Sequence, residues 1–431
     1  MQNASADIDA GYYKDRLREI ASRLFPAQND AVLVEILRVT LMKTDSASMN
    51  DKGGGGSTTV TESCNVANCD SLERQIMVNE VSAKDCLYVI RQEHSWSPLT
   101  ISLPALESIL RTHRVFPQFY NVLQSYGIKE HEDHHDWTGF CYNIEENPAY
   151  FGDQVTRRHE CCYNFHYVER NNRNRGDPWS LRQMGLYQQF DFSSDRTMWL
   201  ILQPPGTILD ATRQIWNENE TGSRAPQRWI VQTHLLYMSL MVRNWQEYLD
   251  YLQSDLASFN NKACFSRVGI DYRHDYSVTF LDCQDLQLLQ QKLERTSKVL
   301  EANLAVARGC ATNLARLTSP CTAKVEALNM ADAENSIEQL QSNIRRIRSI
   351  IKQSDGISSL DPQLSKRQND ARYQPGYAGE PNDAATYLYR ESGGEQLAVS
   401  TCRAKPDGFA NTEGLHDSGD DVLASVPYSG K

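Results

Sequence analysis

The sequence predicts an α+β fold, in which a sheet domain of the α/β type with packed helices is followed by long antiparallel, stalk-like helices and a disordered C-terminal tail. Three observations predict this arrangement. Residues 177–205 contain two aromatic and apolar runs of strand type joined by a short polar turn. Residues 226–358 place apolar side chains at helical spacing. In residues 359–431 glycine, proline and charged residues replace the periodic pattern, which is typical of disorder.

Composition and charge narrow the class of protein. At 431 residues and 40% hydrophobic content, the chain can hold two or three domains with a real core. Its formal charge is −11, with 44 basic and 55 acidic residues, so nucleic acid is not expected as a partner. No signal peptide opens the sequence, and its apolar runs fall far short of the roughly 20 residues that span a bilayer. We therefore expect a cytoplasmic protein without a membrane span, whose eleven scattered cysteines are reduced thiols.

Residues 1–43 are predicted to form N-terminal helices. Leu17, Ile20 and Leu24 recur at helical spacing, residues 32–41 continue the apolar pattern, and Pro26 separates two helices. Residues 44–61 follow as a flexible linker rich in glycine and serine. These glycines do not form a phosphate-binding loop, because Lys52 precedes them instead of standing just before the Ser or Thr.

Residues 62–225 are predicted to form the sheet domain. The sheet should be at least partly antiparallel, because residues 193–195 supply a hairpin turn and a pair of prolines ends the second strand. Ser102 is predicted as the N-cap of a helix with Pro104 in its first turn, and Gly127 closes the helix that follows. The expected strands are residues 86–91, 137–144, 160–168, 179–192 and 197–202.

Residues 226–358 are predicted to form a bundle of long helices. Ile337, Leu340, Ile344 and Ile347 step by three and four, which is typical of a coiled-coil seam. The seam covers only two heptads, so we expect it to pack within the monomer rather than in a long intermolecular coil. The helices expected after the sheet are residues 206–218, 226–259, 282–318 and 322–354.

The densest group of ionisable side chains lies at residues 130–136, which hold three imidazoles and four carboxylates. Carboxylates suit Mg²⁺ or Ca²⁺ and imidazoles suit Zn²⁺ or Ni²⁺, so the mixture selects neither class. The alternative is a solvated loop before the strand that begins at Trp137. A divalent ion, with Mg²⁺ as one choice, is thus the only cofactor that the sequence indicates. The candidate ligands are His131, Asp133, His134, His135 and Asp136.

A second set of metal-binding residue types does not predict a zinc site. His159 and Cys161 would lie on one face of a strand and Cys162 and His166 on the other, so the four side chains cannot converge on one ion. We therefore expect these residues to be structural.

The central hairpin supplies the residues that we expect to be structural or family-specific. Arg182 shares a face with apolar neighbours and needs a partner, because an unpaired buried charge is costly. The alternatives are an internal salt bridge or exposed edge, which we favour, and an anchor for an acidic group at a subunit or stalk contact. Gln183 shares its face with Tyr187. The aromatic residues expected in the core are Trp179, Tyr187, Trp199 and Trp245.

Several stretches of this sequence together resemble a known family. PWSLRQMGLYQQF is followed closely by WLILQPP; HHDWTGFCYN and YNFHYVERNNR precede them, and WQEYLDYL and IRSIIKQSDGISSL come later. This order resembles the cytosolic part of fungal CorA-like metal-ion transporter proteins, over roughly residues 80–360. The resemblance implies an α/β cytosolic domain, long stalk helices, and association with itself or with other family members through those helices.

The sequence departs from this family after Leu360. Members that transport ions continue into two membrane helices joined by a loop with a Gly-Met-Asn signature, and the chain shows neither. We therefore expect a soluble, non-catalytic interaction or divalent-ion-responsive module without transport activity of its own. The alternatives are a truncated or mispredicted magnesium transporter and, as the weakest, an unidentified enzyme, because no Gly-x-Ser-x-Gly or Gly-x-Gly-x-x-Gly motif stands in a suitable place.

Overall fold

The computed structural model of the chain gives the arrangement of most residues before position 361. The residues that it describes are 2–27, 32–43, 57–130, 137–147, 156–173, 176–218, 226–265, 280–317 and 323–360. The predicted tail beyond Leu360 lies outside them.

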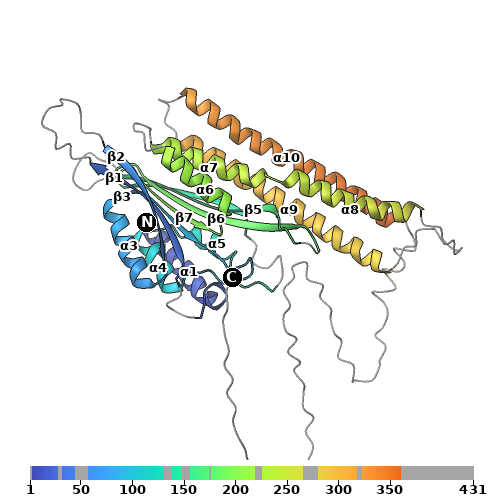
Figure 1. The fold of residues 1–431 in the computed structure, drawn as a ribbon, viewed down its shortest axis with the longest axis horizontal. Coiled ribbons are helices and arrows are strands. Elements are labelled where there is room, and N and C mark those ends of the chain that lie inside the picture. The colour runs from blue at the N-terminus through green and yellow to red at the C-terminus, as the bar shows by residue number, and fades with distance from the viewer. Residues whose placement is uncertain are drawn as a thin grey trace, which may run out of the picture. The chain divides into compact units, whose positions relative to one another are not determined.

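A seven-stranded sheet in the order β2-β1-β3-β7-β6-β5-β4 forms the centre of the fold (Figure 1). β3 and β7 pair in parallel, and the other neighbouring strands pair antiparallel. The predicted α+β class and the partly antiparallel sheet are therefore confirmed. The strands are β1 (Val34–Lys43), β2 (Ser57–Val66), β3 (Ala83–Ile90), β4 (Gly139–Asn147), β5 (Thr156–Arg170), β6 (Trp179–Asp191) and β7 (Arg196–Leu202).

The predicted central hairpin is present as β6 and β7, with Gly185 opposite Leu202 and Asp191 opposite Arg196. Its turn is held by the Asp191 carboxylate, which accepts hydrogen bonds from the Ser193 backbone N–H at 2.8 Å and from the Ser194 hydroxyl at 2.7 Å. Asp195 takes a positive φ of 51°, a conformation that Asp tolerates better than most residues.

The prediction of helix over residues 32–43 is wrong, because β1 occupies most of them, and residues 57–61 of the predicted linker belong to β2; residues 44–56 of that linker lie outside the described residues. Val34 and Ile36 pack into the core on one side of the sheet, whereas Leu37 and Val39 pack into the core on the other. A strand buried on both faces has a continuous apolar run, which residue spacing alone does not distinguish from a buried helix.

One face of the sheet carries the N-terminal helices (Figure 1). The predicted cap Ser102 precedes α4, although its side chain makes no capping hydrogen bond, and Gly127 has a φ of 91° after α5. Helix α3, which we did not predict, begins after Asn68, whose side chain accepts a hydrogen bond from the Ser71 N–H. The helices are α1 (Gln2–Glu19), α2 (Ala21–Leu24), α3 (Cys69–Ser82), α4 (Leu103–Thr112) and α5 (Phe119–Leu123).

The other face carries the later helices. A single helix was predicted over 226–259, but it is broken at Asn244, which has a φ of 64° and donates a side-chain hydrogen bond to the Val168 carbonyl at 3.0 Å. This bond to the sheet fixes the break, so the tertiary contact outweighs the local helical pattern. The helices are α6 (Gly206–Glu218), α7 (Pro226–Val242), α8 (Trp245–Phe265), α9 (Phe280–Leu317) and α10 (Ala323–Leu360).

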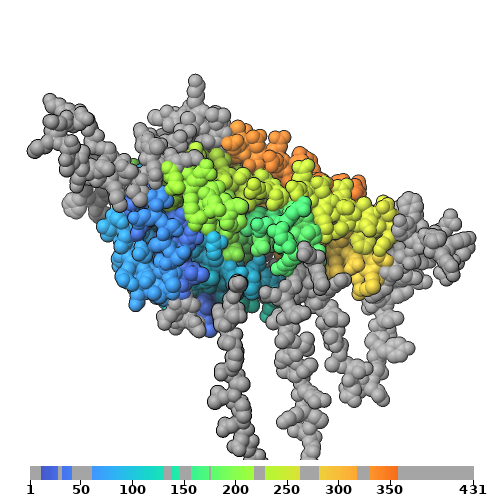
Figure 2. Space-filling model, in the orientation of Figure 1, coloured from blue at the N-terminus to red at the C-terminus, as the bar shows by residue number. Residues whose placement is uncertain are grey.

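The predicted isoleucine seam packs within the chain, as expected. Leu340, Ile344 and Ile347 of α10 are buried in the same core as residues of the sheet and of α7, α8 and α9, and Ile337 is partly buried against that core. In the space-filling view the surface of α10 lies along that of α7 and α8 (Figure 2). Among the described residues, no helix has both the length and the apolar character needed to cross a membrane.

Candidate functional site

The candidate metal ligands His131, Asp133, His134, His135 and Asp136 lie outside the described residues, so their prediction stays a prediction. The part of the chain that is described holds no group of three or more His, Cys, Asp or Glu residues placed to bind a metal ion.

The cysteines and histidines of β5 divide between the two faces of the sheet, as their spacing predicted. Cys161 lies on the side of α7, with its thiol 3.9 Å from the His234 ring, whereas Cys162 belongs to the core on the opposite side. His159 also faces the later helices, and His166 shares a hydrogen bond of 3.0 Å with the Thr138 hydroxyl.

The aromatic residues expected in the core are all buried. Tyr187 and Trp245 are 0% exposed, Trp199 is 1% exposed and Trp179 is 7% exposed. Tyr187 donates a hydrogen bond of 2.6 Å to the buried carboxylate of Glu160, so it anchors a polar pair inside the core on the side of α5.

Arg182 and Gln183 have structural partners within the chain. The Arg182 guanidinium forms an ion pair of 2.9 Å with Glu169 on the neighbouring strand, as the internal salt-bridge alternative expected. The Gln183 amide donates to the Ser125 carbonyl at 2.7 Å and accepts from Asn164 at 3.3 Å, which ties the sheet to the turn after α5.

The most extensive set of specific contacts fastens α9 to the sheet. Strand β4 stops pairing with β5 at the register of Gly139 with Asn164, so the backbone of His166 has no β4 residue beside it. The Asn303 side chain takes this place: its oxygen accepts from the His166 N–H at 3.0 Å and its amide donates to the His166 carbonyl at 2.6 Å. One side chain thus completes the ladder and satisfies two buried backbone groups.

Further along α9, Asn313 accepts a hydrogen bond of 2.9 Å from the His159 ring nitrogen Nε2. Next to this contact, Tyr163 and His234 share a hydrogen bond of 2.9 Å. Burial, and to a smaller extent the proximity of His159, lowers the pKa of His234 to about 3. Burial also lowers the pKa of His159, while its bond to Asn313 opposes this shift. Both imidazoles are therefore neutral inside this core at physiological pH.

Helix α9 approaches β4 closely at Gly309. A Cβ atom built on Gly309 would lie 2.7 Å from Cδ1 of Phe140 and 3.0 Å from its Cβ, so glycine is required for this packing distance. Two residues further along β4, the Tyr142 hydroxyl accepts a hydrogen bond from the Arg316 guanidinium, which lies 4.8 Å from the centre of the Tyr142 ring.

A further contact lies in the N-terminal half of α9, where Lys292 forms an ion pair of 2.5 Å with Asp177. The contacts at Lys292, Asn303, Gly309 and Asn313 therefore fix the position of α9 along the sheet. Our sequence interpretation missed all four. An asparagine and a glycine at helix positions that face inward were the available signal, because both have low helix propensity.

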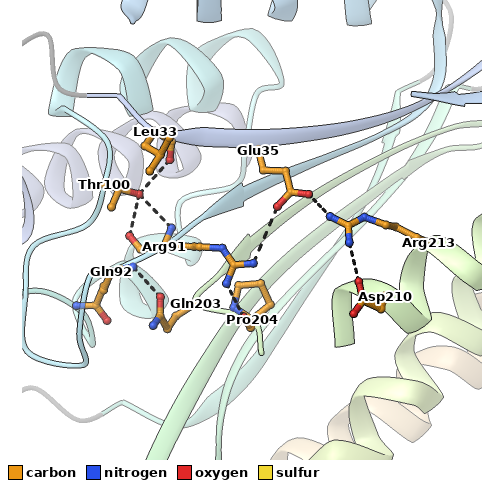
Figure 3. A network of polar contacts seen from close by, with 9 residues as sticks. All are labelled: Leu33, Glu35, Arg91, Gln92, Thr100, Gln203, Pro204, Asp210 and Arg213. Carbon is orange, nitrogen blue, oxygen red and sulfur yellow. Dashed lines mark hydrogen bonds and ion pairs between the residues drawn. The ribbon is translucent and has the colours of Figure 1, made fainter. Parts of the chain in front are cut away.

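A separate network of charges joins the ends of the parallel strands to β1 and α6 (Figure 3). The Glu35 carboxylate on β1 accepts a hydrogen bond from Arg213 and lies 4.0 Å from Arg91, which follows β3. Arg213 also pairs with Asp210 at 2.7 Å, and Arg91 donates to the Pro204 carbonyl at 3.0 Å. Two guanidinium groups face two carboxylates, so the network is balanced in charge and cross-links these elements.

Neutral contacts extend this network. The Gln92 backbone N–H donates to the side chain of Gln203 at 2.6 Å, and the Thr100 hydroxyl donates to the Leu33 carbonyl at 3.0 Å (Figure 3). The residues after both parallel strands are therefore fixed to each other. These contacts fix the strands of the sheet relative to one another, and α9 is attached to the same sheet by hydrogen bonds.

Comparison with known proteins places the chain in a family. The sequence model of the family described as CorA-like transporters matches residues 1–264. The match starts well before the segment in which we recognised the resemblance and includes β1 and β2, in agreement with their place in the sheet. It ends before α9. No curated protein matches the chain.

Solved structures also show similarity. The CorA magnesium transporter from Methanocaldococcus jannaschii is 10% identical, with a TM-score of 0.38, and the alignment covers 78% of each chain. The full-length CmaX protein is 13% identical, with a TM-score of 0.41 and coverage of 81% of this chain and 82% of that chain. The cytoplasmic domain of ZntB from Vibrio parahaemolyticus is 10% identical, with a TM-score of 0.34, and the alignment covers 65% of this chain and 91% of that chain.

These TM-scores are too low to assign the chain to a family. The assignment therefore rests on the sequence match, which spans more than half of the chain. On that match, this chain belongs to the family of CorA-like transporters.

Proposed function

We propose that this chain is a non-catalytic interaction module of the CorA-like type, which responds to a divalent ion and associates through its long helices. The observation that carries the proposal is the attachment of α9 to the sheet by directional contacts from Lys292 to Asn313. A helix held in this way moves with the sheet, so an event at the sheet alters the position of the helix pair.

The outer surface of α9 supports the interaction role. Leu281 and Leu288 are 68% and 60% exposed, and their spacing of seven residues places them on one stripe of the helix. A second copy of the chain, or another family member, would cover this stripe. Such a contact makes a homo-oligomer the simplest assembly to test.

The ion-responsive part of the proposal rests on the chemistry of residues 130–136 and on the acidic balance of the chain, which has a formal charge of −11. Carboxylates bind Mg²⁺ through oxygen, and an acidic surface attracts divalent cations. Binding there would occur next to Trp137, whose backbone contacts Ser125 and Asn164 at the edge of the sheet.

Light scattering of the purified full chain with Mg²⁺, and separately with a chelator, tests both parts. We expect a self-associated species whose size or stability changes on adding Mg²⁺. The double variant Leu281→Ser with Leu288→Ser should be smaller in solution, whereas Met77→Ser, which removes an apolar side chain with 66% exposure from α3, should not change the size. A monomer that is indifferent to Mg²⁺ would contradict the proposal.

The family name favours a second candidate, namely that the chain is the extramembrane part of a transporter whose membrane helices are encoded beyond the codon of Leu360. Reading the genomic DNA after that codon tests it directly. An open reading frame for two apolar segments of about 20 residues would support this candidate, and the absence of such a frame would exclude it.

A further inference from the structure

Two cysteines stand directly opposite each other where β4 pairs with β5. Cys141 is half-buried on β4, and Cys162 is buried on β5. Opposed residues of an antiparallel ladder point to the same side of the sheet, and here both side chains meet the core beneath α5.

Opposed positions of this kind suit a disulfide. Their Cα atoms lie about 4.5–5.5 Å apart in antiparallel sheets. Disulfide-bonded cysteines have Cα separations of about 4.4–6.8 Å. The bond can therefore form without a change in the register of the two strands.

We propose that Cys141 and Cys162 form a reversible disulfide when the chain meets a peroxide, which covalently joins the edge strand β4 to β5. Cys141 is the attacking residue, because it is the one of the pair that solvent reaches. Cys162 lies behind it in the core and resolves the oxidised intermediate.

The chemistry balances with hydrogen peroxide as the oxidant. The Cys141 thiolate attacks one peroxide oxygen, so an S–O bond forms, the O–O bond breaks, and hydroxide leaves and takes up a proton to become water. The Cys162 sulfur then attacks the sulfenic sulfur, the S–S bond forms, and the S–O bond breaks with loss of a second water that carries the Cys162 proton. Two thiols are oxidised, one peroxide is reduced to two waters, and an added dithiol reverses the bond.

The electrostatic surroundings support this division of roles. The hydrogen bond from Cys162 lowers the pKa of Cys141 to about 7, although burial opposes the shift. Burial, followed by its bond to Cys141, raises the pKa of Cys162. The thiolate that reacts with peroxide is therefore formed at the solvent-accessible position.

The position of the pair connects it to α9. Phe140 and Tyr142 flank Cys141 on β4 and contact Gly309 and Arg316 on the opposite side of the sheet. A bond at Cys141 would therefore restrain the strand on which this part of α9 rests.

Peroxide treatment of the full chain, followed by alkylation and peptide mass spectrometry, tests the proposal. We expect one linked pair of peptides that contains Cys141 and Cys162, with a loss of two hydrogens that a dithiol restores. Cys141→Ser should abolish the link, and Cys162→Ser should leave a sulfenic acid on Cys141 that dimedone traps. Cys64 is the matched control, because it is also partly exposed but burial raises its pKa, so Cys64→Ser should keep the link.

A measurement on the unmutated chain tests the proposal even if the cysteine variants fail to fold. At pH 7 Cys141 should react with iodoacetamide about fivefold or more faster than Cys64, since its larger thiolate fraction outweighs its lower intrinsic nucleophilicity. Equal rates for the two cysteines would overturn the proposal, as would oxidation of Cys141 to the sulfinic acid while Cys162 remains open to alkylation.

Discussion

Asp85 is an acidic residue at the start of β3 that lies almost entirely out of water. It is 6% exposed, and among the described residues its Oδ1 atom has no hydrogen-bond partner. Burial raises its pKa to about 7, against the opposing effect of its hydrogen bond with Thr197. The carboxyl group is therefore protonated in the folded chain under mildly acidic conditions, where it is ionised in the unfolded chain.

We predict from this shift that the stability contributed by the protonated Asp85 is lost as pH rises from about 4 to about 7, because the unfolded chain releases the Asp85 proton first. Asp85→Asn removes this titration and should raise the free energy of unfolding at pH 8 by on the order of 2–4 kcal/mol. Urea unfolding at several pH values checks it, with the exposed Asp285→Asn as a control that should change little. An unchanged pH profile in Asp85→Asn would refute this account.

The pKa shift of His234 makes stability depend on pH in the opposite direction. Its pKa of about 3 lies below the value near 6.5 of an unfolded histidine, so the unfolded chain takes up a proton first as pH falls. We predict that the contribution of His234 to stability is lost as pH falls from 6.5 to 4, opposite to the contribution of Asp85 over the same window, and that His234→Gln removes this part of the slope even if it lowers stability overall. The exposed His94→Gln serves as the control and should retain the full slope in the same urea titration.

At the scale of elements, the close packing of α9 against β4 depends on the absence of a side chain at Gly309. Gly309→Ala would place a Cβ within 2.7 Å of the Phe140 ring, near the stem of a side chain that cannot swing away easily. Overpacking of this kind costs about 1–3 kcal/mol. In an open helix position, by contrast, the same substitution stabilises by about 1 kcal/mol.

Gly356 in α10 provides that open position, because nothing lies within 4 Å of a Cβ built on it. We therefore predict that Gly309→Ala lowers the thermal midpoint and that Gly356→Ala raises it slightly. Combining Gly309→Ala with Phe140→Leu should recover part of the loss, since the smaller side chain makes room for the new methyl group. Calorimetry on the four proteins, including the parent chain, measures these shifts; a stabilised Gly309→Ala would show that α9 does not approach β4 so closely.

At the scale of the whole molecule, sheet and long helices share one core. The cluster that contains Leu37 of β1 and Trp199 of β7 also contains Ile347 and Ile357 of α10. The described residues fall in one compact unit, Met1–Ala384. The helix pair is therefore built on the sheet rather than joined to it by a linker.

A cooperative unit should unfold in one step. We predict that Ile347→Ala, which empties a fully buried position of α10, lowers the stability of sheet and helices together by about 2–5 kcal/mol. The fluorescence of the seven tryptophans, among them the buried Trp199 of β7, and circular dichroism at 222 nm, which reports the helices, should give the same shifted midpoint. Ser349→Ala on the exposed side of α10 is the control, and two separate transitions would contradict the prediction.

The sequence by itself determined the elements whose patterns are local. The β6–β7 hairpin, the α6 boundaries and the two long C-terminal helices follow from alternation, turn residues and helical spacing within short windows. Trp179, Tyr187, Trp199 and Trp245 were predictable as core residues because large aromatic side chains are seldom left in water.

The tertiary structure alone decided the features that join distant residues. Strand β1 is buried on both faces, so its pattern resembles that of a buried helix until β2 and β3 pair with it. Asn303 and His166 lie 137 positions apart, and Arg213 and Glu35 lie 178 positions apart. A hydrogen bond between such residues leaves no trace in the spacing of either segment, because its geometry exists only after the whole sheet and the helices on it have assembled.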